Sequence, residues 1–188
     1  MNKLSNHHAA DEGWLKRYYF VRAAFSMCWV IAVLTLARQS AVASAVLLVA
    51  YPAWDALANM ADGRRSGGLA ANRTQLLNVV VSLAVALALA ISLPDMHRVL
   101  AVFGAWAILS GLLQLGTAVR RWKSSGAQWA MVLSGAQSAL AGAVFIGQAR
   151  MPAEPKVATL AGYAGFGAFY FLVSALLLQF RPRRLKAG

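Results

Sequence analysis

The sequence contains few cysteines and few charged residues. Only one of its 188 residues is a cysteine, Cys28, and only 13% are charged. A single cysteine excludes an internal disulfide and a zinc site built from cysteines. Because an ordinary soluble domain is about one quarter charged, the low charge argues against a soluble globule. The net charge of +12 comes from short basic groups between long uncharged stretches. A nucleic-acid binder clusters such residues on one face, so we expect no nucleic-acid partner.

The chain also lacks the residue sets that catalysis requires. Its three histidines, His7, His8 and His97, lie outside the apolar segments, and one acidic residue, Asp55, lies inside them. Neither a histidine-based nucleophilic triad nor an intramembrane carboxylate pair can be built from these residues. The sequence contains no glycine-rich phosphate loop with a lysine and no dinucleotide fingerprint. We therefore predict a non-enzymatic protein with no catalytic residue, no cofactor and no metal.

Apolar residues are abundant, at 60% of the chain, and the mean hydropathy is +0.57. Four uncharged stretches, at 74–94, 99–119, 124–149 and 157–180, are each long enough to cross a bilayer core, which takes about 20 residues. Two further segments, 18–37 and 41–61, carry one charge each, Arg22 and Asp55. None of the six alternates polar and apolar residues as a membrane β-strand does. The sequence predicts an all-α integral membrane protein with six transmembrane helices.

The positions of lysine and arginine predict the orientation, because cytoplasmic loops are enriched in these residues. With a cytoplasmic N-terminus, all but four of the 18 basic residues lie inside. The four that lie outside are Arg38, Arg98, Arg150 and Lys156. We expect a multi-pass protein of the bacterial inner membrane with both termini in the cytoplasm. Its parts are a polar, interfacial N-terminal segment (1–17), a membrane domain (18–184) and a basic tail (185–188).

Short connections at 38–40, 94–98 and 149–156 predict three antiparallel helical hairpins, at about 18–61, 74–119 and 126–180. The hairpins run in the same direction and share a weak repeat. The rising helices contain Arg22-x3-Ser26, Asn78-x3-Ser82 and Ala130-x3-Ser134. The returning helices contain Tyr51-x3-Asp55, Trp106-x3-Ser110 and Tyr170-x3-Ser174. Chance recurrence of serines and aromatics in apolar helices is the alternative interpretation.

Residues 78–122, 131–152 and 166–184 carry a family resemblance. The pattern is a helix, a turn that often contains proline, and then a helix with an aromatic residue and a Ser-Gly or Asp-Gly step. Ser110-Gly111 fits this step. In this pattern the chain resembles the HdeD-like acid-resistance membrane proteins over roughly 18–184. Asp55-Ala56 and Ser174-Ala175 depart from the glycine of the pattern. The resemblance implies three hairpins and a role in acid or envelope-stress tolerance, and it implies no catalytic residues.

Arg22 and Asp55 are the only charges placed inside predicted spans. They lie at similar distances from the first predicted turn, so antiparallel helices bring them to the same depth. An ionised side chain in a membrane is tolerated when it is paired with the opposite charge. We predict a structural ion pair between them, and the alternative is that Arg22 extends to the lipid headgroups.

Two other features are candidate sites. Ser134, Ser138 and Gly142 recur at every fourth position and predict a ridge of small residues on which another helix packs closely. The ridge fits the centre of the bundle or a subunit interface, so a homo-oligomer is one possible assembly. His97 lies in an external connection and is a candidate acid sensor, because imidazole gains a proton in mildly acidic water. An exposed histidine without a function is the alternative.

Two functions from different classes follow. The first is a non-enzymatic protein of acid or general envelope-stress tolerance that acts through membrane lipids or other envelope proteins. The second is a channel or secondary transporter for a small solute or protons. Many transporters use inverted repeats and helices broken near mid-membrane. The hairpins here repeat in parallel orientation, which favours the first hypothesis.

Overall fold

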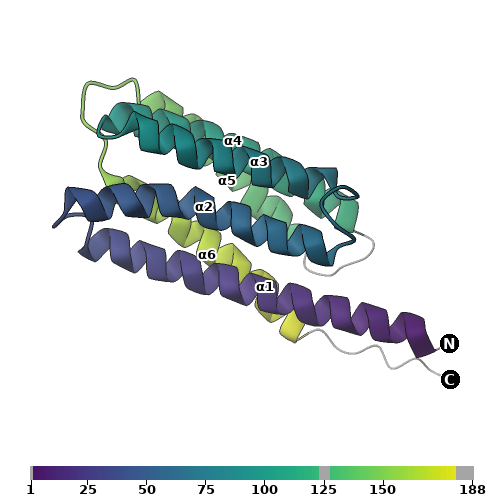
Figure 1. Cartoon of the computed structure of the whole chain (residues 1–188). Helices are drawn as coiled ribbons and strands as arrows, with labels where there is room; N and C mark the ends of the chain where they lie inside the picture. The colour runs from purple at the N-terminus through teal and green to yellow at the C-terminus, as the bar shows by residue number, and fades with distance from the viewer. Residues whose placement is uncertain (1, 123–127, 181–188) are drawn as a thin grey trace.

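The computed structural model describes residues 2–122 and 128–180, with side chains from residue 13 onward. Over these residues the chain forms six α-helices and no strand (Figure 1). All six contain a stretch long and apolar enough to cross a membrane, which in the first helix is Gly13–Thr35. The predicted fold class is confirmed, and the chain is a multi-pass membrane protein with six candidate spans. The helices are α1 (Asn2–Thr35), α2 (Ala41–Arg65), α3 (Arg73–Ser92), α4 (Met96–Arg121), α5 (Gln128–Gln148) and α6 (Val157–Gln179).

Side chains with short polar ends begin three of the helices. The Ser40 hydroxyl accepts a hydrogen bond from the amide of Ala43 at 3.2 Å and caps α2. Asn72 caps α3 in the same way, and Asp95 accepts from two amides at the start of α4. Such caps satisfy amides that have no partner inside the helix. The Ser40 and Asp95 caps lie at the turns of the first and second hairpins, and the Asn72 cap lies in the connection between these two hairpins.

The six helices form a closed ring. Each helix contacts the next one in the chain, and α1 closes the ring against α6. The most extensive contacts join neighbouring hairpins, between α2 and α3, α4 and α5, and α6 and α1. Contacts within a hairpin are smaller, and that between α1 and α2 is the smallest of the six. The two helices of one hairpin are therefore less closely packed against each other than helices of neighbouring hairpins.

Glycines bring α4 and α5 together. Gly104 lies against Gly142, and Gly111 lies against Gly135. A Cβ atom added to any of the four would lie less than 3.0 Å from the carbonyl oxygen of the facing glycine. Within lipid, helices associate through close packing and not through water exclusion, so small residues at a contact allow the largest gain.

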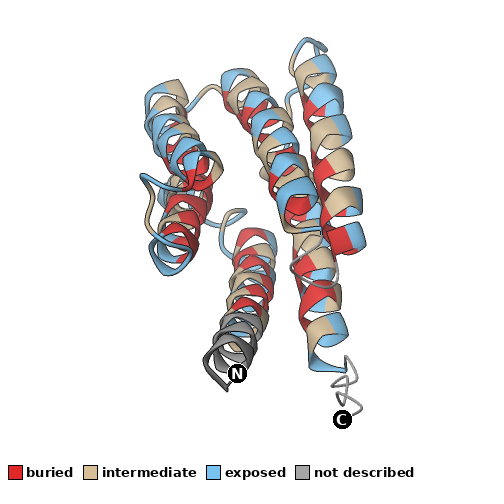
Figure 2. Ribbon diagram, turned by 90° about the vertical axis from the view of Figure 1, so that its right-hand side faces the viewer, coloured by how far each residue is buried: buried red, intermediate tan, exposed pale blue. Residues whose placement is uncertain are grey.

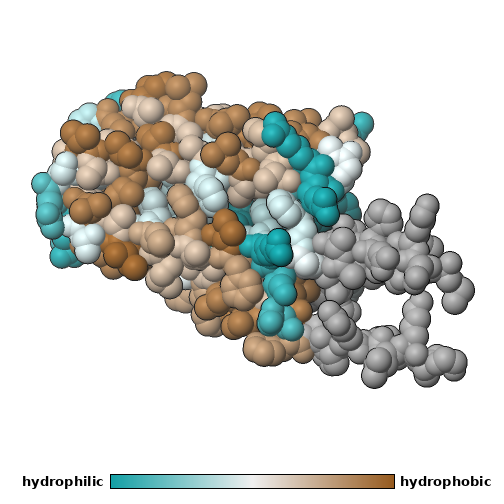
Figure 3. All heavy atoms as spheres, turned by 60° about the horizontal axis from the view of Figure 1, so that its bottom comes forward, coloured by the Kyte–Doolittle hydropathy of each residue, from teal (hydrophilic) through white to brown (hydrophobic). Residues whose placement is uncertain are grey.

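The outer surface of the ring is apolar. In Figure 2 the buried residues form stripes on each helix, while exposed residues cover the remaining faces. The exposed set includes many large apolar side chains, such as Ile91, Leu140 and Phe166. Hydrophobic residues cover most of the face in Figure 3, and hydrophilic residues gather toward its two ends. This pattern fits a surface that contacts lipid around its waist and water at both ends.

The interior divides into two halves. We call the half with the three hairpin turns the distal half, and the half toward the start of α1 and the end of α6 the terminal half. A cluster of apolar side chains fills the distal half and includes Trp29, Leu48, Phe103, Phe145 and Leu160. Every buried polar residue among those described lies at the middle of its helix or nearer the terminal end.

Candidate functional site

One face of α2 carries the polar groups around which the site is built. Tyr51, Asp55, Asn59 and Asp62 are all buried. Their spacing of three or four residues places them on one side of the helix, facing the inside of the ring. A helix that presents two carboxylates to a membrane interior needs donors from its neighbours to compensate them.

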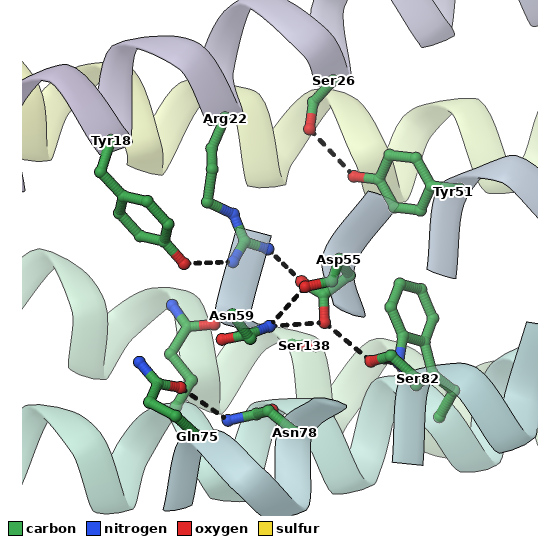
Figure 4. Close-up of polar contacts among 12 residues, drawn as sticks. Tyr18, Arg22, Ser26, Tyr51, Asp55, Asn59, Gln75, Asn78, Ser82 and Ser138 are labelled. Carbon is green, nitrogen blue, oxygen red and sulfur yellow. Dashed lines mark hydrogen bonds and ion pairs between the residues drawn. The ribbon is translucent and has the colours of Figure 1, made fainter. Parts of the chain in front are cut away.

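The first carboxylate, Asp55, is surrounded by donors from three helices (Figure 4). The Arg22 guanidinium on α1 forms an ion pair with one Asp55 oxygen. The other oxygen accepts hydrogen bonds from the Asn59 amide at 2.9 Å and from the Ser82 hydroxyl on α3 at 2.8 Å. Arg22 also donates to the Tyr18 hydroxyl at 2.9 Å. The structure therefore brings together the two residues predicted to pair.

Arg22 is held inside the ring and does not extend to the headgroups. Its side chain is 15% exposed and that of Asp55 is 6% exposed. The guanidinium carbon lies 4.3 Å from the centre of the Phe171 ring on α6, at the distance of a cation–π contact. The ion pair and the ring contact thus connect α1 with α2 and with α6.

A second buried ion pair lies nearer the terminal end. Arg121, the last residue of α4, contacts the Asp62 carboxylate at 2.7 Å, and the Gln75 amide donates to the same carboxylate. The Asp62 side chain is 1% exposed. Sequence reasoning missed this pair because Arg121 belongs to a basic group that indicates topology. The available signal was the position of Asp62, two helical turns after Asp55 on the same face of α2.

A hydrogen bond between a serine and an aromatic side chain recurs in each hairpin. The Ser26 and Tyr51 hydroxyls are 3.1 Å apart, Trp106 Nε1 donates to Ser82 Oγ at 3.1 Å, and the Ser138 and Tyr163 hydroxyls are 2.7 Å apart. The partners are 25, 24 and 25 residues apart along the chain. We call these six residues the serine–aromatic layer.

The layer supports the threefold repeat, but in the third hairpin the bonded residues differ from those that the sequence repeat indicated. The bonded pair there is Ser138 and Tyr163, whereas the internal sequence repeat contains Ser134 and Tyr170. Ser134 and Ser138 both fit a spacing of one helical turn, and α6 contains two tyrosines, so the pattern alone allowed either choice. Phe103 packs edge-on against Trp106 and Tyr163, at ring-centre distances of 5.0 and 5.9 Å, and joins two of the pairs.

A cavity lined by polar and apolar side chains extends from this layer toward the terminal end. Its deeper part has a volume of about 50 Å³ and its outer part about 40 Å³. Ser26, Tyr51, Trp106, Ser138 and Tyr163 line the deeper part, so the serine–aromatic layer forms its distal wall. Both parts are lined by Arg22, Asp55, Ser110, Gln114 and Phe171. The two ion pairs and the cavity therefore make up one site within the terminal half.

The three residues of the predicted ridge on α5 lie in two environments: two of them contact α4, and one lines the cavity. Gly142 lies against Gly104, and Ser138 donates to the Ala107 carbonyl at 2.8 Å, so both contact α4 inside the same chain. Ser134 is buried and lines the cavity. The residue that continues the close contact is Gly135. A seven-residue step recurs between Gly104 and Gly111 and between Gly135 and Gly142, and this is the signal that sequence reasoning missed.

His97 lies at the distal end, away from the cavity. Its Nδ1 is 3.2 Å from the Ala149 carbonyl oxygen and links the start of α4 to the end of α5. A carbonyl oxygen only accepts, so Nδ1 carries the proton in this contact. The acid-sensing role of His97 stays a prediction. Within the part of the chain that the structure describes, no three His, Cys, Asp or Glu residues are grouped to hold a metal.

Comparison with protein-family models, with curated proteins and with solved structures finds no match to this chain. The resemblance to the HdeD-like family stays a prediction from the sequence motifs.

Proposed function

We propose that this protein is a channel or transporter that admits a small solute into its cavity from the terminal side of the membrane. The observation that carries the proposal is the cavity, with two ion pairs and free hydroxyl and amide groups inside six candidate spans. Polar groups at this depth are costly and commonly mark a substrate pathway. The parallel repeat, which favours the other hypothesis, says less about function than these contacts.

The distal half supplies the barrier in this proposal. The serine–aromatic layer and the apolar cluster of Trp29, Leu48, Phe103, Phe145 and Leu160 fill the ring beyond the cavity. A solute in the cavity is therefore separated from the distal side. Passage across the membrane requires these side chains to part.

The proposed orientation places the terminal half in the cytoplasmic leaflet of a bacterial inner membrane, because most basic residues lie at that end. The exposed Arg64, Arg65 and Arg73 contribute to this excess. A reporter that is active only in the cytoplasm, fused to Gly188, should give signal. An expressed but silent fusion would reverse the orientation.

The proposed cellular setting is acid or general envelope-stress tolerance, without enzyme activity, as the HdeD-like resemblance implies. It is supported by sequence motifs and not by a residue of the cavity. Cells that lack the gene should survive acid or heat challenge less well than their parent. Unchanged survival together with unchanged envelope permeability would count against this setting.

The transport proposal is tested with purified protein in liposomes, where solute influx is followed by light scattering. Ser110 lines both parts of the cavity, so Ser110→Phe should block their junction and remove most of the influx. Leu109, its neighbour, is 46% exposed on the outer surface, and Leu109→Phe is the size-matched control that should retain influx. An absence of protein-dependent influx, or equal loss in both variants, contradicts the proposal.

A further inference from the structure

The ionised groups that line the cavity cancel each other. Arg22 is paired with Asp55, and Arg121 is paired with Asp62. These four side chains are the charged residues among those lining either part of the cavity. The cavity therefore presents two positive and two negative groups in closed pairs, with no net charge left to compensate an ion.

Neutral side chains also donate hydrogen bonds to the two carboxylates. Besides its ion pair with an arginine, Asp55 accepts hydrogen bonds from Asn59 and Ser82. Asp62 likewise accepts a hydrogen bond from Gln75 in addition to its arginine partner. A cation that approached either carboxylate would have to displace these donors. The hydrogen-bonding capacity left for a solute lies elsewhere in the cavity.

The groups that are free for a solute are mostly neutral. They are hydroxyls, an amide and the Trp54 indole N–H, together with the Nε of the Arg22 guanidinium, which has no partner among the described residues. The Tyr19 side chain is 1% exposed, lines the outer part of the cavity, and its buried hydroxyl has no partner in the described part of the chain. Other side chains lining the cavity likewise form no hydrogen bond with described residues. These are Ser110, Ser134, Gln137 and Tyr170. Such groups bind molecules that donate and accept hydrogen bonds without carrying charge.

The size of the cavity limits the solute. Each part holds roughly three to four water molecules, since one water needs about 10–15 Å³. A solute that replaces the water in one part has a similarly small number of non-hydrogen atoms. Small amides and short polyols combine this size with several hydrogen-bonding groups.

We infer that the cavity selects small uncharged amides or polyols and excludes ions of the same size. The inference rests on the proposed transport function and names its substrate class. An ion that enters must leave water, and it finds no uncompensated charge of opposite sign, because each charged group in the lining already has its counter-charge. It therefore carries a desolvation penalty that no net charge in the cavity offsets. A neutral solute exchanges its hydrogen bonds with water for those with Tyr19, Ser110, Ser134 and Gln137.

Three planar probes of equal non-hydrogen atom count isolate the effect of charge. Urea is neutral, guanidinium is a cation and nitrate is an anion. In liposomes that contain the full chain, urea influx should rise clearly above that of protein-free liposomes. Guanidinium and nitrate should cross about 60- to 300-fold more slowly than urea, which is the insertion penalty of an ion expressed as a rate ratio.

The outcomes separate the two proposals. If urea does not cross faster than in protein-free liposomes, the transport function fails, and the substrate class fails with it. If guanidinium or nitrate crosses as fast as urea, transport stands and the inferred selectivity is wrong. If urea alone crosses, both are supported.

Two variants alter the charge balance itself. Asp62→Asn leaves one excess positive charge, so the ratio of nitrate to urea influx should rise. Arg121→Gln leaves one excess negative charge, so the ratio of guanidinium to urea influx should rise. Asp95 lies at the distal end with a 41% exposed side chain, and Asp95→Asn is the control in which both ratios stay as in the parent. Unchanged ratios in both cavity variants, when each folds, would overturn the inference.

Discussion

The distal and terminal halves of the ring are held together by different interactions. In the distal half, aromatic and aliphatic side chains pack against each other, and the one indole donor of Trp29 is satisfied by the Leu47 carbonyl at 2.7 Å. In the terminal half, two ion pairs and their hydrogen bonds connect α1, α2, α3 and α4. Each of the six helices runs through both halves.

This difference suggests that close packing and the choice of helix neighbours depend on different parts of the ring. Apolar packing in the distal half stabilises through close contact, as between Gly104 and Gly142, and an apolar side chain that loses its partner can still contact lipid. An ion pair between helices is satisfied in few arrangements, because a misplaced partner leaves a charge in lipid. We therefore assign the choice of helix neighbours mainly to the terminal half, and the following substitutions test that assignment.

The largest effect is expected at the centre of the terminal half. Asp55→Asn removes the charge that compensates Arg22, and breaking such a buried pair costs about 3 to 5 kcal/mol of unfolding free energy. The measurement is the free energy of unfolding in mixed detergent micelles. Adding Arg22→Gln should restore much of the loss, since no buried charge then lacks a partner.

The control for this substitution lies in the distal half. Leu100 is 1% exposed, and Leu100→Met conserves its volume, so it should cost less than about 1.5 kcal/mol. A double variant Arg22→Gln/Asp55→Asn as unstable as the sum of its single variants would show that the two side chains do not interact. Equal costs for Asp55→Asn and Leu100→Met would remove the contrast between the halves.

The second ion pair should matter less than the first. Asp62→Asn removes the charge that compensates Arg121, but the Asp62 carboxylate has two described donors, Arg121 and Gln75, whereas the Asp55 carboxylate has three. We expect a cost of about 2 to 3 kcal/mol, the range for a buried polar group left without its partner. A cost larger than that of Asp55→Asn in the same assay would place the controlling contact at the end of the ring.

Close packing between α4 and α5 is tested by adding a methyl group. Gly142→Ala places a Cβ against Gly104 and Ile108 and should cost about 1 to 3 kcal/mol, as overpacking does. Gly147 is in the same helix with no atom within 4 Å of an added Cβ. Gly147→Ala should therefore be neutral or slightly stabilising. Equal effects of the two substitutions would exclude a close glycine contact.

The helices and their order across the membrane could be predicted because each span is a long apolar run. Equal depth was enough to propose the contact between Arg22 and Asp55. The ring closure between α1 and α6 could not be predicted, because connection length specifies which helices form a hairpin but not which hairpins become neighbours. The Asp62 contact with Arg121 was hidden for a related reason, since charges near helix ends are usually solvated and give no sign of a partner.

The smallest effects are expected in the serine–aromatic layer, where the two halves meet. Tyr51→Phe and Tyr163→Phe each remove one hydrogen bond, whose net value is about 0.5 to 1.5 kcal/mol. Trp106→Phe also shrinks a buried side chain, so it adds a packing cost to the lost bond. Ser82 still donates to Asp55, and Ser138 still donates to the Ala107 carbonyl, so their hydroxyls stay bonded.

Ser26 has no second partner of this kind within the described part of the chain. Tyr51→Phe should therefore cost more than Tyr163→Phe, although Ser26 can recover part of the loss by donating to a carbonyl one turn earlier in α1. Unfolding in mixed micelles measures the order of these two isosteric substitutions. If Tyr163→Phe is the more costly, the second bond of Ser138 does not compensate for the lost one, and the hydrogen bonds left to the serines do not set the order within the layer.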